Sequence, residues 1–593
     1  MTNKVCYWLL CFTPIGESHV PRIFGFAEFI SSLALLVIVY TVVDVRYRFR
    51  VAIAPLPLYQ FTFALIGLIG AESLLSEIWL AQQWWVPEFF VIPGVVWQGI
   101  FGALFLVTFM IWIWYAFMRP PVFGKRNAVR YTRELYRLIV KGSDSELPVI
   151  AAELARSARS LVNCSRSVPS RFPGDEQSQS AGAPRKARAE DYAHDLLLLI
   201  GNRKLCRHII ASAPVTALAF FDEAAKAKKF RLPLGQFAKN ISGEAISNRD
   251  SILYHETNGF SSGLLGYIKP FSQTIYGSYW LVEGLGERFG APLDVDYREQ
   301  RDWDAEQWRA FCRATATTMS SFLKETGGDH HSAVLFRAMD DIEGSFGDMY
   351  KLNDIGVDYY DTDIYRRFGV AVEFVRHVVK IIDEQDQPPL GRKLRRREQD
   401  PQKDIYDRLA DLMFEIVFAA ATVSGPPDRA WMIHHNSAWH DFFSLGAQGK
   451  TWRIVQFKSR RLLYDEIRHM DAFPNFKGAK VLGFCLNVMG LKVARGDLGR
   501  AYRPLARAVY AWTRRNYSRL LADNPSVAAA VLIGSITYDE PNNRLVKAYA
   551  QGLESEPPKE YFVVDGGGEH RSRPSRTPVR RVSRRRRGQG GPQ

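Results

Sequence analysis

Apolar positions are unevenly distributed along the chain, with three long apolar runs in the first 118 residues. The runs cover 24–43, 58–80 and 95–118. A helix needs about 20 apolar residues to cross roughly 30 Å of hydrocarbon. We therefore predict a membrane protein with three transmembrane helices in a unit over 23–118, preceded by a segment 1–22. A cleaved signal peptide fits poorly, since it has one short apolar core and two further runs follow here.

The basic residues between the runs predict the orientation of this unit. The first connection holds Arg46, Arg48 and Arg50, whereas the second, 81–90, holds Trp84 and Trp85 but no Lys or Arg. Seven basic residues follow between 119 and 141. Connections rich in Lys and Arg stay on the cytoplasmic side. We therefore expect a multi-pass plasma-membrane protein with its N-terminus outside and most of the chain in the cytoplasm.

Three carboxylates interrupt the apolar runs. Glu28 and Glu77 are predicted near the outer ends of the first and second spans, and Glu72 lies closer to mid-membrane. Carboxylates in a bilayer are costly and face protein or water, so they are candidates for a pore or a contact between subunits. The structural alternative is that Glu28 and Glu77 reach the interface and that Glu72 is a buried, neutral carboxyl. Gly67 and Gly70 beside Glu72 favour close helix approach.

A basic stripe follows the third run. Steps of four, three, four and four residues place its members on one narrow face of an amphipathic helix within a predicted juxtamembrane region, 119–162. Such a stripe attracts anionic lipid headgroups. The alternative is a topology signal on an ordinary packed helix. The stripe consists of Arg126, Arg130, Arg133, Arg137 and Lys141.

The remainder is predicted to be a linker, a cytoplasmic domain that is mainly α, with α+β as the alternative, and a tail. Segment 163–190 has the composition of a flexible coil. Segment 191–565 contains apolar residues at helical spacing, with a possible subdivision at 386–404. The tail, 566–593, has nine Arg and one Glu, which is +8 of the net charge of +15, and is predicted to be disordered. We expect helices at 192–212, 304–324, 366–384, 404–422 and 497–522, and strands at 480–487, 530–538 and 561–564.

Histidines form two groups that are weak candidates for a metal site. No pair has the i, i+4 spacing of a zincin motif, and the six cysteines are scattered without a zinc-ligand spacing. The sequence identifies neither catalytic residues nor a cofactor. The two candidate groups are His434, His435, His440 and Asp441, and Asp329, His330 and His331.

These patterns favour a non-enzymatic membrane protein whose cytoplasmic domain senses or scaffolds, as a homo-oligomer, with a pore as one version of this hypothesis. The first alternative is a membrane-anchored, metal-dependent hydrolase that uses the histidine groups. The second is a tether whose arginine-rich tail binds lipid or RNA through salt-sensitive charge contacts. Nucleic-acid binding is expected through the tail only, because the rest of the chain carries just +7 of the net charge.

Overall fold

The fold is mainly helical, as the sequence predicts. The described residues of the computed structural model fall into two compact units, which we describe separately. Unit 1 comprises Met1–Ala419 and His440–Ser459, and unit 2 comprises Ala420–Trp439 and Arg460–Gln593. The structure describes residues 5–7, 10–14, 24–42, 44–82, 84–87, 94–166, 187–256, 261–262, 266–267, 270–287, 290–327, 331–356, 358–385, 403–443, 449–492, 502–549 and 558–565.

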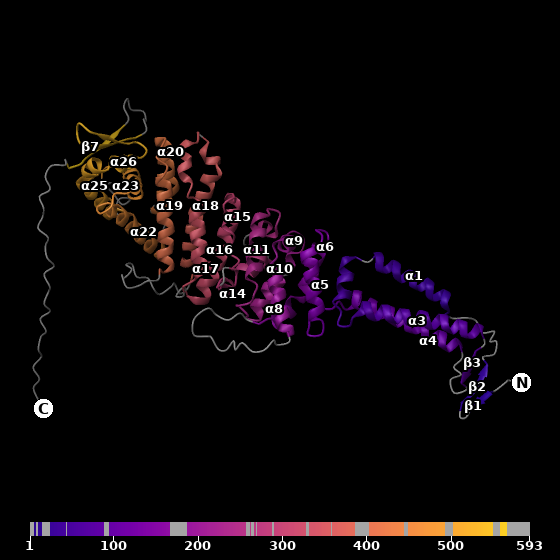
Figure 1. Cartoon of the computed structure of the whole chain (residues 1–593). Helices are drawn as coiled ribbons and strands as arrows, with labels where there is room; N and C mark the ends of the chain where they lie inside the picture. Colours follow the sequence, from indigo (N-terminus) through magenta and orange to yellow (C-terminus); the bar gives the residue numbers. More distant parts are fainter. Residues whose placement is uncertain are drawn as a thin grey trace, which may run out of the picture. The chain divides into compact units, whose positions relative to one another are not determined.

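The apolar runs form helices that pack together (Figure 1). They are α1 (Phe26–Val42), α3 (Leu58–Ala81), and α4 (Gly94–Ile113) with a π-helical turn, η2 (Trp114–Met118). Phe29, Ile66, Ile69 and Phe101 form their shared core. Gly70 lets Phe29 approach, because a Cβ at this position would lie 2.6 Å from the Phe29 ring.

Two helices in the described part of the chain are long and apolar enough to cross a membrane, by length and composition. They are Leu58–Trp79 and Val96–Met118, which match the second and third predicted runs. Helix α1, with 17 residues, is shorter than both and is not one of these two candidates. The pair Arg203–Ser212 and Pro214–Lys226 passes the same test only if both are counted as one span, and it is bent by 107°.

Three short strands form an antiparallel sheet at one end of the apolar helices. Strands β1 (Val5–Tyr7) and β2 (Leu10–Pro14) form a hairpin, and β3 (Trp85–Pro87) pairs with β2. Thr13 faces Val86 in this register. The sheet therefore joins the N-terminal segment to the connection between α3 and α4, although the sequence predicted no strands here.

Short helices surround the opposite end of α3 and α4. Helix α2 (Val45–Ala52) fills the connection between α1 and α3. After η2 the chain forms α5 (Ala128–Lys141), α6 (Glu146–Leu154), a 3-10 turn η3 (Ala155–Ser157) and α7 (Ala158–Cys164). The elements α5, α6 and η3 lie within the predicted juxtamembrane region, 119–162, and α7 extends two residues beyond it. Most of the predicted linker lies outside the described residues, and α8 begins at Ala189.

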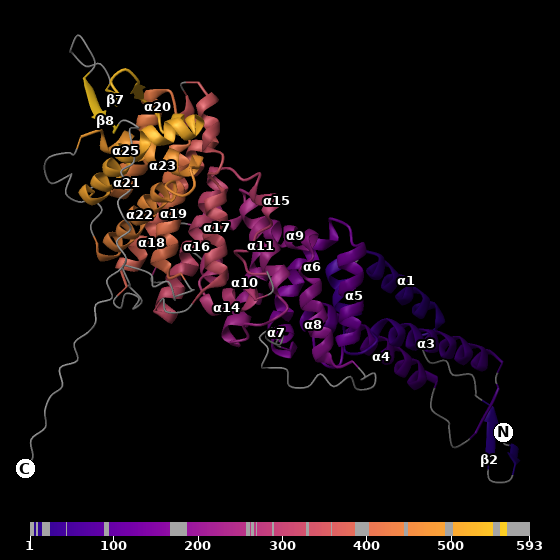
Figure 2. The same ribbon diagram turned by 60° about the vertical axis from the view of Figure 1, so that its left-hand side comes forward.

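The rest of unit 1 is a series of packed helices, among which α16 and α18 lie side by side (Figures 1 and 2). The prediction of one helix at 192–212 is wrong, because Asn202 caps a second helix by accepting a hydrogen bond from the Leu205 N–H. The predictions at 304–324, 366–384 and 404–422 are confirmed. The helices are α8 (Ala189–Leu199), α9 (Arg203–Ser212), α10 (Pro214–Lys226), α11 (Gly235–Ser247), α12 (Ile252–His255), α13 (Pro270–Tyr276), α14 (Tyr279–Gly286), α15 (Tyr297–Gln300), α16 (Ala305–Thr326), α17 (Ala333–Gly344), η4 (Met349–Asp354), η5 (Tyr359–Asp361), α18 (Asp363–Asp383), α19 (Ile405–Ala421) and α21 (His440–Phe443), with two short strands, β4 (Ser261–Ser262) and β5 (Gly266–Tyr267).

Unit 2 combines helices with a three-stranded antiparallel sheet. The predicted strand at 480–487 is wrong, because these residues lie within α23. The predicted strand at 530–538 is confirmed only from Ile536 onward, and the one at 561–564 is confirmed as β8. The described part of the predicted helix at 497–522 is α25. The elements are α20 (Pro427–Trp431), the π-helix η6 (Met432–Trp439), α23 (Phe476–Met489), α25 (Arg503–Asp523), α26 (Pro525–Ala529), β6 (Ile536–Asp539), β7 (Arg544–Ala548) and β8 (Lys559–Val563), and α22 (Lys450–His469) contributes to both units.

Candidate functional site at the basic end of the apolar helices

Arg50, in α2, joins three parts of unit 1 through one buried guanidinium. Its Nε lies 2.9 Å from Oε2 of Glu153, and its Nη2 lies 2.6 Å from Oε1 of the same carboxylate, on α6. Its Nη1 donates to the carbonyl oxygen of Ala116 at 2.9 Å, at the end of the third apolar segment. Both side chains of the ion pair are 7 % exposed. Breaking such a pair leaves a buried, uncompensated charge, so the loss of either partner alone would destabilise the contact between these three segments.

The sequence of α2 explains why Arg50 is buried. In VRYRFRVA, Val51 packs with Leu58, Trp112 and Ala116 against the ends of α3 and α4. Burial of that face brings Arg50 inside, whereas Arg46 stays 41 % exposed and reaches Glu153 at 3.5 Å. This basic connection is therefore part of a structural contact. We call the contact of Arg50 with Glu153 and Ala116 the joint.

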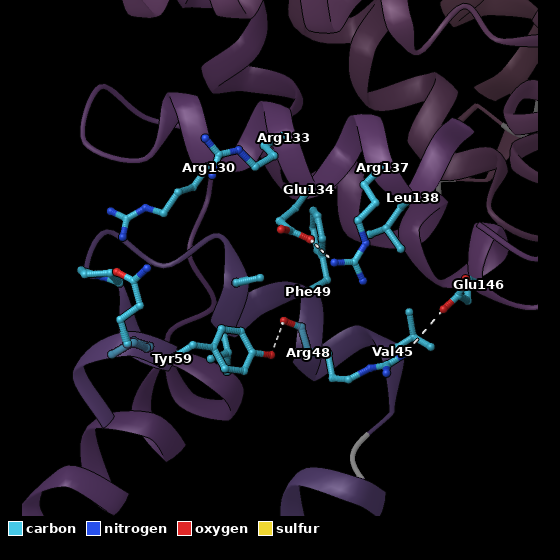
Figure 3. Close-up of a pocket in the computed structure, with 15 residues that line it drawn as sticks. Val45, Arg48, Phe49, Tyr59, Arg130, Arg133, Glu134, Arg137, Leu138 and Glu146 are labelled. Carbon is cyan, nitrogen blue, oxygen red and sulfur yellow. Dashed lines mark hydrogen bonds and ion pairs between the residues drawn. The ribbon is translucent and has the colours of Figure 1, made fainter. Parts of the chain in front are cut away.

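Beside this joint lies a cavity of about 560 Å³ (Figure 3). It is enclosed by α2, the first turn of α3 and one face of α5, and Glu146 of α6 also lines it. Figure 3 shows Arg130 and Arg137 extending from α5 toward the side on which Arg48 and Tyr59 lie, whereas Arg133 runs along α5 toward Arg130. Four arginines and two glutamates line the cavity, which leaves an excess of two positive charges.

The two acidic residues of the cavity each have an arginine partner. Glu134 lies 3.6 Å from Arg137, and Glu146 lies 3.5 Å from Arg48. One Nη of Arg130 donates to the Pro55 carbonyl, which orients its guanidinium. Arg133 is exposed and has no partner in the described part of the chain. The excess positive charge is therefore concentrated at Arg130 and Arg133.

The predicted basic stripe is divided by this geometry. Arg130, Arg133 and Arg137 line the cavity, whereas Arg126 and Lys141 are exposed and do not line it. The opposite face of α5, with Tyr131, Leu135, Leu138 and Ile139, is buried as the sequence predicts. The spacing of residues in the sequence predicted α5 and its basic face, but it did not predict that α2 supplies Arg48 on the other side of a pocket.

Glu28 and Glu77 stabilise the N-terminus of α1. Glu28 Oε2 accepts from the Gly25 N–H, and Glu77 Oε1, on α3, accepts from the Phe26 N–H, both at 2.9 Å. The first turn of a helix has unsatisfied N–H groups and a positive dipole end, which carboxylates stabilise. Gly25 is needed at this contact, because a Cβ would lie 2.5 Å from Glu77 Oε1.

Glu72 differs from the other two acidic residues. It lies within the candidate span Leu58–Trp79, and it is exposed on the surface of the chain. In the described part of the chain it has no hydrogen bond or ion pair. Glu72 is therefore not buried within the chain itself.

The histidine groups do not form a metal site in the part of the chain that the structure describes. No group of three or more His, Cys, Asp or Glu residues there is placed to hold a metal ion. His434 is buried, with its Nε2 2.9 Å from the Ala420 carbonyl oxygen and its Nδ1 3.1 Å from Asn487 Nδ2. Both ring nitrogens are thus engaged, and burial lowers the pKa of His434 to about 4.

The other candidate ligands are also accounted for or lie outside the described residues. His435 stacks on Trp431 at a ring distance of 4.4 Å, and His440 is exposed. Asp441 pairs with Arg376 at 3.1 Å, and the His331 ring contacts Phe336. Asp329 and His330 lie outside the described residues, as do the tail and most of the 386–404 segment.

The structure thus defines a mainly helical protein with apolar helices of membrane-spanning length and a basic pocket at one end of them. No family model matches the chain, and neither a curated protein nor a solved structure matches it. Its function must therefore be argued from its own residues.

Proposed function

We propose that the chain is a multi-pass membrane protein whose cytoplasmic helical domain senses or scaffolds and is mechanically coupled to three membrane spans. The contact of Arg50 with Glu153 and Ala116 carries the proposal. This contact joins the connection between the first two apolar helices, the end of the third and the beginning of the helical domain. A tilt or shift of the spans would therefore move α6 rather than bend a loose connection.

The position of the N-terminal sheet supports the orientation. Strand β2 pairs with β3, so the N-terminal segment and the connection after α3 lie at the same end of the apolar helices. Arg48 and Arg50 lie at the opposite end. By the positive-inside rule, that basic end faces the cytoplasm.

Coupling is tested with the full chain in nanodiscs of phosphatidylcholine with 14- or 18-carbon chains. Hydrophobic mismatch changes helix tilt. We expect hydrogen exchange in α6 to differ between the two bilayers in the wild-type protein and in Arg46→Gln. In Arg50→Gln the difference should disappear, because the guanidinium that joins α2 to α6 is lost. Equal exchange of wild-type α6 in both bilayers would refute the coupling.

We further propose that the protein forms a homo-oligomer through the α3 surface around Glu72, with a pore as its functional form. An unpartnered carboxylate on an apolar span is stabilised when it faces water or another subunit. Light scattering in detergent should give four or more subunits for the wild type, and Glu72→Leu should lower this number or abolish cation flux from proteoliposomes. A monomeric wild type would refute the oligomer, and unchanged mass and flux in Glu72→Leu would exclude a role for the carboxylate.

A further inference from the structure

We infer that the cavity between α2, α3 and α5 is a binding site for a phosphate group, and that its ligand is the headgroup of an anionic membrane lipid. The cavity, at about 560 Å³, has the size of a small-molecule site. The choice of a lipid as the source of the phosphate rests on the proposed membrane placement. The phosphate chemistry itself rests only on the residues of the cavity.

The arrangement of charge favours a phosphate over a cation or a neutral ligand. Arg130 and Arg133 supply planar guanidinium groups, which bind phosphate oxygens through charge-assisted, often bidentate hydrogen bonds. Glu134 and Glu146 are paired with Arg137 and Arg48, so neither acidic residue is left to repel an anion at Arg133. Binding a phosphate there would neutralise the excess of two positive charges.

The apolar part of the lining favours a lipid as the source. Leu58 and Tyr59 begin α3 and Pro57 directly precedes it, so the cavity lies where that apolar helix starts. In the proposed orientation this is the depth of the cytoplasmic headgroups. A phosphate at Arg133 would then have its glycerol group beside the first turn of α3 and its acyl chains along the span.

The pocket makes a different prediction from a diffuse basic surface. On a membrane surface, each exposed Lys or Arg contributes about equally to attraction of anionic lipid. In a defined binding pocket, the contribution of a basic side chain to lipid binding depends on whether that side chain lines the cavity. Arg133 lines it, whereas Arg126, which precedes α5, and Lys141, the last residue of α5, do not, so all three share charge and exposure but not position.

The test uses the full chain in detergent, titrated with dioleoylphosphatidic acid and followed by native mass spectrometry. We expect one tightly bound lipid per chain, bound about tenfold or more weakly by Arg133→Gln, because a charge-assisted hydrogen bond to phosphate is lost. Arg126→Gln and Lys141→Gln should bind within about twofold of the wild type, since about equal contributions are expected only from a diffuse surface. Unchanged circular dichroism of the variants would show that these exposed substitutions leave the fold intact.

Two results would overturn the inference: similar losses in all three variants, or no bound phosphatidic acid in the wild type together with no binding of glycerol 3-phosphate. A separate titration with glycerol 3-phosphate distinguishes the two sources of phosphate, a lipid headgroup and a soluble ligand. Glycerol 3-phosphate that binds as tightly as the lipid, with the same Arg133 dependence, would support the phosphate site and assign it to a soluble ligand. This outcome would leave the site standing even if the proposed membrane placement failed.

Discussion

Replacement of Glu153 by Gln should open the joint between the apolar helices and the helical domain. Glu153 is 7 % exposed and accepts both close contacts from Arg50. The amide introduced by Glu153→Gln retains one neutral acceptor, but the Arg50 guanidinium loses its counter-charge and stays buried. Breaking a buried pair on one side costs about 3–5 kcal/mol, and the retained acceptor places the expected loss near the lower end, at about 3 kcal/mol.

This loss is measured as the free energy of local opening of α6. At about 1.4 kcal/mol per tenfold change, 3 kcal/mol corresponds to a roughly hundredfold increase in the open population. Amide hydrogen exchange of α6 in the full chain should accelerate by that factor, whereas exchange in α16, which makes no contact with the pair, should not change. The matched control is Arg46→Gln, whose 41 % exposed side chain touches the same carboxylate and should cost less than about 1 kcal/mol.

The double variant Arg50→Met/Glu153→Met distinguishes a broken pair from a distorted helix. Replacing both members of a buried pair by apolar residues is often neutral or stabilising, so this variant should recover most of the lost protection. An acceleration of less than about fivefold in Glu153→Gln would refute the reasoning, because by the same tenfold conversion the pair would then contribute less than about 1 kcal/mol. Equal losses in the single and double variants would point to packing rather than charge.

Two further predictions concern unit 2, and each has an internal control. The pKa of His434 is about 4, below the unfolded value of about 6.5, so the unfolded state binds more protons between these values and stability falls as pH decreases. The unit should lose about 2 kcal/mol between pH 7.5 and 5, measured by urea unfolding, and His434→Gln should remove this dependence; an equal slope in the variant would contradict the assignment. Gly483→Ala should destabilise unit 2 by about 1–3 kcal/mol, because the added Cβ would lie 2.4 Å from the Val531 carbonyl oxygen. The control Gly369→Ala, with open space around it, should stabilise its helix by about 0.5–1 kcal/mol. A shift of the melting temperature in the same direction in both variants would refute the close contact.

Periodicity predicted the helices that bury one face and misjudged the helix that is buried nearly all round. α16 and α18 alternate buried and exposed positions at helical spacing, so their bounds were close to correct. In α23 every position from Val481 to Met489 is buried, and the run from Val481 to Leu486 has no polar residue whose spacing would distinguish a helix from a buried strand. The five-residue strand β8 was predicted, whereas β1, with three residues, and β2, with five, were not.

The candidate site was predictable in part. The positions of Arg130, Arg133 and Arg137 on one face of α5 follow from their spacing. The burial of Arg50 does not follow from the spacing, because nothing in the sequence separates it from Arg46 and Arg48 in the same connection. A hint existed in Glu153, which ends the apolar segment LPVIAA in α6 and needed a partner if that segment was buried. Identifying Arg50 as this partner, 103 residues away, required the structure.

The pocket and the joint share two helices, and this connection makes a last prediction. Arg48 in α2 and Glu146 in α6 line the pocket, while Arg50 in α2 and Glu153 in α6 form the buried pair. Opening of α6 would therefore remove one side of the pocket, so a bound ligand should oppose it. A ligand at a hundred times its dissociation constant stabilises the binding-competent state by about 2.7 kcal/mol, which is a roughly hundredfold slowing of exchange at most.

Saturating phosphatidic acid should therefore slow amide exchange in α6 of the wild type and of Arg126→Gln, but not of Arg133→Gln, which lacks the ligand contact. In Glu153→Gln the lipid should still protect α5, since the pocket arginines remain, while protection of α6 falls because its charged link to α2 is gone. Equal protection of α6 in Glu153→Gln and the wild type would show that the pocket acts on α6 directly through Glu146. In that case Arg50 would hold the joint together without carrying the signal, and the coupling would have to be sought in the pocket itself.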